Sequence, residues 1–217
     1  MKATVKKHIL KFKQASGTSR GVLLEKETWF LILENNGKKG IGECALFRGL
    51  SYDDRLGYSD KLKEICKDVE LGKPVTLLWE ELREWPSIQF GLEQAFLSLE
   101  SDNPFVLFPS RFTNSQSAIS INGLVWMGNH EFMKRQIDEK IKSGFKCVKL
   151  KIGAINFDEE LDLIKYIRSQ YPKEIIELRV DANGGFSSIE ALGKIIQLSE
   201  LDLHSIEQPI EKKQYDS

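Results

Sequence analysis

Three short segments decide the fold: 146-KCVKLK-151, 175-IIELRVDAN-183 and 203-LHSIEQP-209. Each contains a short apolar run typical of a strand, and polar residues follow where the run ends. Two segments with helical periodicity separate the three runs, and this alternation predicts a parallel sheet or a (β/α) barrel. The carboxyl ends of the strands form the active face of such a barrel. We therefore expect the polar residues at these strand ends to meet at one mouth.

Composition excludes several classes of protein. The chain has 217 residues, of which 41% are hydrophobic and 29% charged, as in soluble globular proteins. The net charge of -1 argues against a nucleic-acid binder, which needs a basic excess. There is no apolar run of the roughly 20 residues that span a bilayer, and no signal-peptide core. Three cysteines without a CxxC pair and three scattered histidines predict a cytoplasmic protein with reduced thiols and no histidine metal site.

The first part of the chain, 1–101, reads as an α+β domain, because strand signals precede helical ones. A linker rich in polar residues follows at 102–116 and marks the boundary. Alternating or β-branched residues predict strands at 7–13, 22–24, 28–34 and 39–44, with a polar loop at 15–21 and a hairpin turn at 35–37. Apolar stripes predict helices at 60–71, 77–85 and 88–100.

The second part, 117–217, changes to a βα period of roughly 30 residues, which is typical of a TIM-type barrel. We expect a first strand at 118–121, followed by the three strands above, so that four strands make the first half of a barrel. The fourth strand would leave an open edge, which could pair with a second copy of the chain. Helices are expected at 131–143, 158–169 and 189–198, capped by Asn129, Asn156 and Ser187.

Lys149 and Lys151 lie two residues apart, so on a strand both side chains point to the same side. Mutual repulsion and burial would lower both lysine pKa values, toward the range where an amine acts as a base. The plainer interpretation is a strand end with two solvated lysines.

Asp181 and Asn183 repeat this spacing one βα unit later, and Glu207 adds a carboxylate after the next unit. Carboxylate and amide oxygens without thiol or imidazole favour Mg²⁺, with Mn²⁺ as the alternative. Taken singly, each has a structural interpretation: Asn-Gly-Gly is ordinary turn chemistry, and Glu207 precedes a proline. Together at successive strand ends, they suit removal of a proton next to a carboxylate by a lysine, with a metal ion stabilising the enediolate.

The motifs Lys149-x-Lys151, Asp181-x-Asn183 and 206-IEQP-209 resemble barrel strands two to four of the enolase superfamily, in its muconate-lactonizing subgroup. The domain before them is similar to that family's capping domain, with 42-GEC-44 at its usual Gly-Glu motif. Within the subgroup the chain resembles the o-succinylbenzoate synthases of menaquinone biosynthesis. The segments that carry this resemblance are 42-GECA-45, 49-GLS-51, 86-PSIQFGLE-93, 121-INGLVWMG-128, 177–186 and 205–210.

The resemblance implies a Mg²⁺-dependent lyase that dehydrates 2-succinyl-6-hydroxy-2,4-cyclohexadiene-1-carboxylate after abstracting its α-proton. Lys151 would be the general base and would return the proton to the leaving hydroxide. Lys149 would keep the pKa of Lys151 low and help polarise the substrate carboxylate. Asp181 and Glu207 would be metal ligands, and Asn183 would either support the metal ligands or face the substrate. Capping loops at 16–21 and 45–51 would close over the mouth, and Arg20 could meet a substrate carboxylate.

The family also needs a third metal carboxylate on the fifth strand and a second lysine on the sixth, and these 217 residues contain neither strand. We therefore expect the chain to be a fragment that is inactive alone. One alternative is a dipeptide epimerase of the same subgroup, which needs a base on each face of the α-carbon. Another is a non-catalytic folding or interaction module that associates through its open edge. The last is a βα scaffold with no site.

Overall fold

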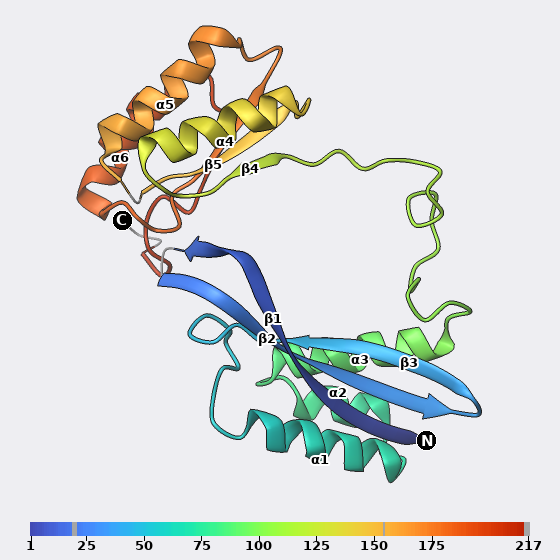
Figure 1. Cartoon of the computed structure of the whole chain (residues 1–217). Coiled ribbons are helices and arrows are strands. Elements are labelled where there is room, and N and C mark those ends of the chain that lie inside the picture. The colour runs from blue at the N-terminus through green and yellow to red at the C-terminus, as the bar shows by residue number, and fades with distance from the viewer. Residues whose placement is uncertain (19–20, 154, 215–217) are drawn as a thin grey trace. The chain divides into compact units, whose positions relative to one another are not determined.

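The computed structural model describes residues 1–18, 21–153 and 155–214, and the chain forms two compact units (Figure 1). The first unit is made of Met1–Ser16 and Val22–Ala118, and the second contains Ile119–Ser217. Each unit has its own hydrophobic core. Within the described ranges, every helix is too short or too polar to cross a bilayer.

The first unit contains a sheet of three strands in the order β1-β2-β3: β1 (Lys2–Thr18), β2 (Gly21–Asn35) and β3 (Lys38–Ala45). β2 and β3 pair antiparallel around the predicted hairpin turn, where Asn36 and Gly37 both have positive φ angles, of 49° and 78°. The prediction of short strands separated by a loop at 15–21 is wrong, because β1 continues to Thr18 and β2 starts at Gly21. Ladder hydrogen bonds join backbone groups, so a strand can continue through residues whose side chains are small and polar.

Three helices share a hydrophobic core with this sheet, and α3 packs on β3 (Figure 1): α1 (Tyr58–Glu70), α2 (Val75–Glu81) and α3 (Pro86–Glu100). All three were predicted, and Pro86 occupies the first turn of α3, where its missing N–H costs nothing. α3 lies very close to β3, since a Cβ on Gly42 would stand 1.7 Å from the carbonyl oxygen of Gly91. Only glycine at both positions permits this backbone approach.

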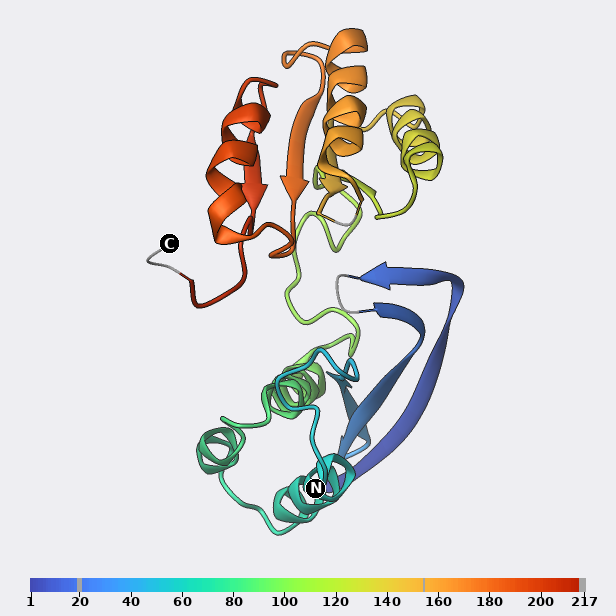
Figure 2. The same ribbon diagram turned by 90° about the vertical axis from the view of Figure 1, so that its left-hand side faces the viewer.

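The second unit alternates strands and helices, as predicted, and its four strands are parallel in the order β4-β5-β6-β7 (Figure 2). Asn129, Asn156 and Ser187 cap the three helices through their side chains, which confirms the predicted caps. The elements are β4 (Gly123–Val125), α4 (His130–Lys142), β5 (Cys147–Lys151), α5 (Phe157–Gln170), β6 (Glu177–Asp181), α6 (Ser188–Ser199) and β7 (Ser205–Glu207).

The first strand of this unit is the one that the sequence misplaced. It was expected at 118–121, but β4 forms at Gly123–Val125. A Cβ on Gly123 would lie 3.0 Å from Lys140 Cβ and from Phe145 Cγ, so the backbone there fits closely against the end of α4. That tertiary fit, rather than the alternation of 118–121, decides which residues pair with β5.

The two faces of this sheet differ in chemistry. Val148, Leu150, Leu178 and Val180 are buried in the core that α4, α5 and α6 share with the strands. Because successive strand residues point to opposite faces, Lys149, Lys151, Arg179 and Asp181 lie on the other face. The fold thus presents a row of charged side chains on the face away from the helices.

Candidate active site

The last residues of three neighbouring strands stand side by side. In the parallel register Lys151 pairs with Asp181, and Asp181 pairs with Glu207. The structure therefore brings together residues that are separated by 30 and 26 positions in the sequence, at the carboxyl ends of their strands. In parallel α/β folds ligands bind at this end of the sheet.

Lys151 is held by two oxygens. Its Nζ lies 2.5 Å from Asp181 Oδ2 and donates to Asn183 Oδ1 at 3.0 Å. Asn183 adopts a left-handed backbone conformation with φ of 48°, and its N–H donates to Asp181 Oδ1 at 3.0 Å. Asp181 is thus bound on both oxygens, and its amide neighbour faces the same lysine.

Lys149 connects the two carboxylates. Its Nζ lies 3.2 Å from Asp181 Oδ2 and also donates to Glu207 Oε2. The hydrogen bond to Glu207, followed by the interactions with Asp181, raises the pKa of Lys149 above its usual value despite some burial. The prediction that its pKa is lowered is wrong, because it considered the repulsion between the lysines and their burial but not the hydrogen bonds that Lys149 makes with the neighbouring carboxylates.

Asp181 is the buried member of the group, with 1% of its side chain exposed. Burial alone would raise the pKa of this carboxyl group. The hydrogen bonds from Lys151, from the N–H of Asn183 and from Lys149 outweigh burial and hold the pKa below its usual value. Asp181 therefore remains an anion that can bind a cation at neutral pH.

The turns after the strands are joined to one another by backbone hydrogen bonds. The N–H of Ile152 donates to the carbonyl oxygen of Asp181 at 2.9 Å, and the N–H of Ala182 donates to Glu207 O at 3.1 Å. Further along, Gly184 N–H donates to Gln208 O at 2.7 Å. We call the strand-end residues Lys149, Lys151, Asp181 and Glu207, together with the joined turns 152–153, 182–186 and 208–209, the strand-end rim.

The oxygen donors at the rim suit a hard divalent cation. Asp181 and Glu207 offer carboxylates and Asn183 offers an amide oxygen, the ligand types that Mg²⁺ prefers. Among the residues that the structure describes, no group of three His, Cys, Asp or Glu side chains is placed to hold a metal ion. The rim therefore provides two carboxylates toward such a site, and the ammonium groups of Lys149 and Lys151 supply their positive partners in this structure.

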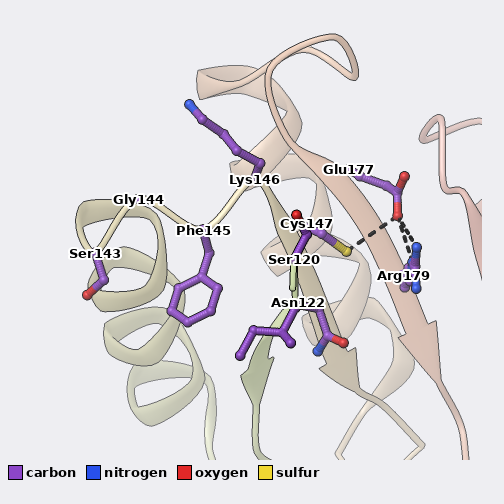
Figure 3. Close-up of a pocket in the computed structure, with 10 residues that line it drawn as sticks. Ser120, Asn122, Ser143, Gly144, Phe145, Lys146, Cys147, Glu177 and Arg179 are labelled. Atoms are coloured by element: carbon purple, nitrogen blue, oxygen red, sulfur yellow. Dashed lines mark hydrogen bonds and ion pairs between the residues drawn. The ribbon is translucent and has the colours of Figure 1, made fainter. Parts of the chain in front are cut away.

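A separate cavity of about 710 Å³ opens at the other end of the strands (Figure 3). Cys147, Glu177 and Arg179 line it, and Glu177 Oε1 accepts from Arg179 Nε at 2.7 Å and from Cys147 Sγ at 3.4 Å. Cys147 begins β5 and Glu177 begins β6, whereas Lys151 and Asp181 end these strands. The cavity is thus distinct from the predicted site.

The remaining predicted residues lie outside this cluster. Arg20 lies outside the described residues, and so does part of the predicted capping loop at 16–21. In the other loop, at 45–51, Arg48 pairs with Glu27 at 2.6 Å and with Asp54 at 2.7 Å, so this loop is bound within the first unit. In the Gly-Glu motif, Glu43 accepts hydrogen bonds from Thr28 at 2.7 Å and Lys26 at 3.1 Å.

One residue beside the site was missed from the sequence. Glu160 belongs to the buried stripe of α5 with Leu163, Ile164 and Ile167, and only 2% of it is exposed. A charged residue in phase with an apolar stripe was a readable signal, because buried charges are rare unless they are bound. Its carboxylate contacts the turn that follows Lys151.

Comparison with known proteins identifies the family. Residues 132–217 match the family described as enolase C-terminal domain-like. Over 99% of its length the chain is 36% identical to an o-succinylbenzoate synthase from Desulfotalea psychrophila, and it spans 66% of that protein. The chain belongs to the enolase superfamily. Its architecture, a capping sheet with helices followed by parallel β/α units, is the corresponding part of the superfamily fold.

Solved structures resemble the chain over all or nearly all of its length. A crystal structure of MenC from Desulfotalea psychrophila has a TM-score of 0.84 at 32% identity, covering all of this chain and 66% of that one. An o-succinylbenzoate synthase from Thermosynechococcus elongatus, described as having Mg in its active site, has a TM-score of 0.74 at 19% identity, with 100% and 63% covered. A dipeptide epimerase from Cytophaga hutchinsonii, in complex with Mg and a dipeptide, has a TM-score of 0.76 at 21% identity, with 99% and 60% covered. The last two establish similarity of fold alone.

Proposed function

We propose that this chain supplies the base and two metal ligands of an o-succinylbenzoate synthase, which dehydrates 2-succinyl-6-hydroxy-2,4-cyclohexadiene-1-carboxylate. The observation that carries the proposal is the row of Lys151, Asp181 and Glu207 at three adjacent strand ends. The 36% identity to a protein of that name supports the choice of reaction. A cytoplasmic protein with a small carboxylate as its substrate is part of the proposal.

Asp181 and Glu207 would hold Mg²⁺, with Mn²⁺ as a substitute. The ion would supply positive charge next to the substrate carboxylate, where negative charge develops as the α-proton leaves. The superfamily pattern would add a third carboxylate ligand, and an ion held by only two carboxylates would depend on water and substrate oxygens for its remaining ligands. We therefore expect the 217-residue chain to bind the ion weakly and to be inactive alone.

The chain's own residues would divide the proton transfers between them. Lys151, as the neutral amine, would take the proton from the α-carbon, and the electron pair of the C–H bond would move toward the carboxylate. The electron pair would then return to form the new ring double bond as the C–O bond breaks, and the same Nζ would give its proton to the departing hydroxide, which leaves as water. Lys149 would bind the substrate carboxylate, and Asn183, whose amide already orients Lys151, would contact the substrate.

The test is a complementation assay. The chain is mixed with the remaining third of the Desulfotalea psychrophila relative, and loss of the cyclohexadiene substrate is followed with and without Mg²⁺. We expect Mg²⁺-dependent dehydration by the mixture, loss of at least 100-fold on Lys151→Ala, and an unchanged rate on Lys146→Ala, which alters an exposed lysine at the start of the same segment.

Three results would count against parts of the proposal. If the mixture epimerises hydrophobic dipeptides and leaves the cyclohexadiene intact, the reaction is that of the epimerases, to which the chain is 23% identical over 98% of its length. If Lys151→Ala retains full activity, the base is another residue. Turnover by the chain alone, at the rate of the relative, would show that two carboxylates suffice.

A further inference from the structure

Glu160 is a buried carboxylate in a helix whose neighbouring stripe residues are leucine and isoleucine. Burying a carboxylate costs several kcal/mol unless hydrogen bonds or charges compensate it (roughly 2–7 kcal/mol even for a neutral polar group). An apolar residue would fill this position of α5 without that cost. The charge at this position therefore calls for an explanation other than packing.

The contacts of Glu160 lie in the turn between Lys151 and α5. Its Oε1 accepts from the N–H of Gly153 at 2.7 Å and from the N–H of Ile155 at 3.4 Å. Because the residue sits in the first turn of α5, the positive end of the helix dipole also favours its charged form. Hydrogen bonds to an ionised acceptor are about twice as strong as neutral ones, so the carboxylate fixes the turn firmly to the helix.

The same turn touches the turn that carries Asn183. Gly153 has φ of 87°, and a Cβ there would lie 3.0 Å from the carbonyl oxygen of Ala182. A Cβ on Gly185 would lie 2.9 Å from Gly153 O and from Ala182 O. With Ile152 N–H bound to Asp181 O at 2.9 Å, any shift of the first turn must move the second.

We propose that Glu160 is a positioning residue: by holding Gly153 and Ile155 on α5, it fixes Lys151 against Asp181 and Asn183. The inference deepens the proposed function, on which it rests for the role of Lys151. Glu160 acts through the backbone and touches neither substrate nor metal. Removal of such a supporting contact around a metal centre costs about 10–100-fold in metal affinity or activity.

The test compares two substitutions that each remove one negative charge from the first turn of α5. Glu160→Gln keeps the length of the side chain and one carbonyl oxygen, so the fold should persist. Glu159→Gln is the matched control, because Glu159 is exposed. Glu160→Ala removes the hydrogen bonds to Gly153 and Ile155 completely. Glu160→Gln should have a smaller effect than Glu160→Ala in each measurement, because it keeps one acceptor oxygen.

Two measurements are made on the 217-residue chain and one on the complemented enzyme. Hydrogen exchange of the Gly153 and Ile155 amides should rise about tenfold in Glu160→Gln, Mn²⁺ affinity should fall about tenfold, and kcat should fall with KM nearly unchanged. Glu159→Gln should change each by less than twofold. If the two glutamine variants behave alike, Glu160 does not position the base.

The exchange measurement separates this inference from the proposed function. If the wild-type chain binds no Mn²⁺ and the complemented enzyme has no activity, the proposed function fails. Faster amide exchange in Glu160→Gln would then still show that Glu160 holds Gly153 and Ile155 on α5, whereas unchanged exchange would show that it does not. If the wild-type chain binds Mn²⁺ and Glu160→Gln shows faster amide exchange with unchanged kcat and Mn²⁺ affinity, Glu160 holds the turn but does not position Lys151. The inference is then wrong.

Discussion

Replacing Lys149 by methionine should weaken the fold and strengthen metal binding at the same time. Lys149 Nζ lies 3.2 Å from Asp181 Oδ2 and is hydrogen-bonded to Glu207. At that distance the attraction to Asp181 is about 5 kcal/mol in an effective dielectric of about 20, before the cost of desolvation. Because Lys149 is 22% exposed and Glu207 60% exposed, water screens these pairs, and the net contribution falls to about 1 kcal/mol.

The free energy of unfolding should therefore fall by about 1 kcal/mol in Lys149→Met at pH 7 and low salt, because Lys151 still pairs with Asp181. The pKa of Lys149 is raised in the folded state, so its stabilisation is fully present below the unfolded pKa of about 10.4 and is lost as pH rises through the folded value. The difference between wild type and variant should accordingly vanish in strong alkali.

Metal affinity should change in the opposite direction. The ammonium group occupies the space beside both carboxylates and repels a second cation there, so its removal should tighten Mn²⁺ binding about fivefold, which corresponds to about 1 kcal/mol. Urea unfolding measures the stability, and the electron paramagnetic resonance signal of free Mn²⁺ measures the affinity. Lys146→Met is the control. Weaker Mn²⁺ binding by Lys149→Met would refute the reasoning and would make Lys149 a support of the metal site.

Two further predictions concern titration and reactivity. The folded state lowers the pKa of Asp181, so its stabilisation is present above the unfolded pKa of about 3.9 and is lost as pH falls toward the folded value. Asp181→Asn should therefore make the free energy of unfolding, measured in urea titrations, depend less on pH below about pH 4. The same pH dependence in variant and wild type would contradict this. Burial raises the pKa of the Cys44 thiol to about 12, whereas Cys147 is partly exposed. A disulfide reagent at pH 8 should therefore label Cys147 first in the native protein, and mass spectrometry of the labelled peptides measures the order of labelling. Faster labelling of Cys44 would argue against the buried position of β3.

The strand ends could be predicted from the sequence because their signals are local. Each polar group directly follows an apolar run, and the alternation with helices is enough to imply parallel neighbours. Lys151, Asp181 and Glu207 were therefore expected at one edge before the register was known, and the register places them side by side. The capped starts of the helices were predictable for the same reason, since Asn129 and Ser187 bind N–H groups only three residues away.

What the sequence did not reveal depends on contacts between distant residues. The direction of the Lys149 pKa follows from Glu207, which lies 58 positions away. The place of β4 follows from the fit of Gly123 against α4. The position of Glu160 in the apolar stripe of α5 indicates that it is buried, but its partner Gly153 could not be predicted, because that hydrogen bond exists only once the turn is folded.

The strand-end rim has a consequence for how such a protein can vary. Since Ile152, Ala182 and Gly184 each donate a backbone hydrogen bond to the neighbouring strand end, the three turns form one hydrogen-bonded chain and not three separate loops. Lengthening one turn would break its hydrogen bond to the neighbouring turn. Insertions should therefore be tolerated between the end of a helix and the start of the next strand, but not in the turns of the strand-end rim. Substitutions in different turns should also show coupled, non-additive effects. A change in one of these turns should therefore alter the position of the polar side chains in all three.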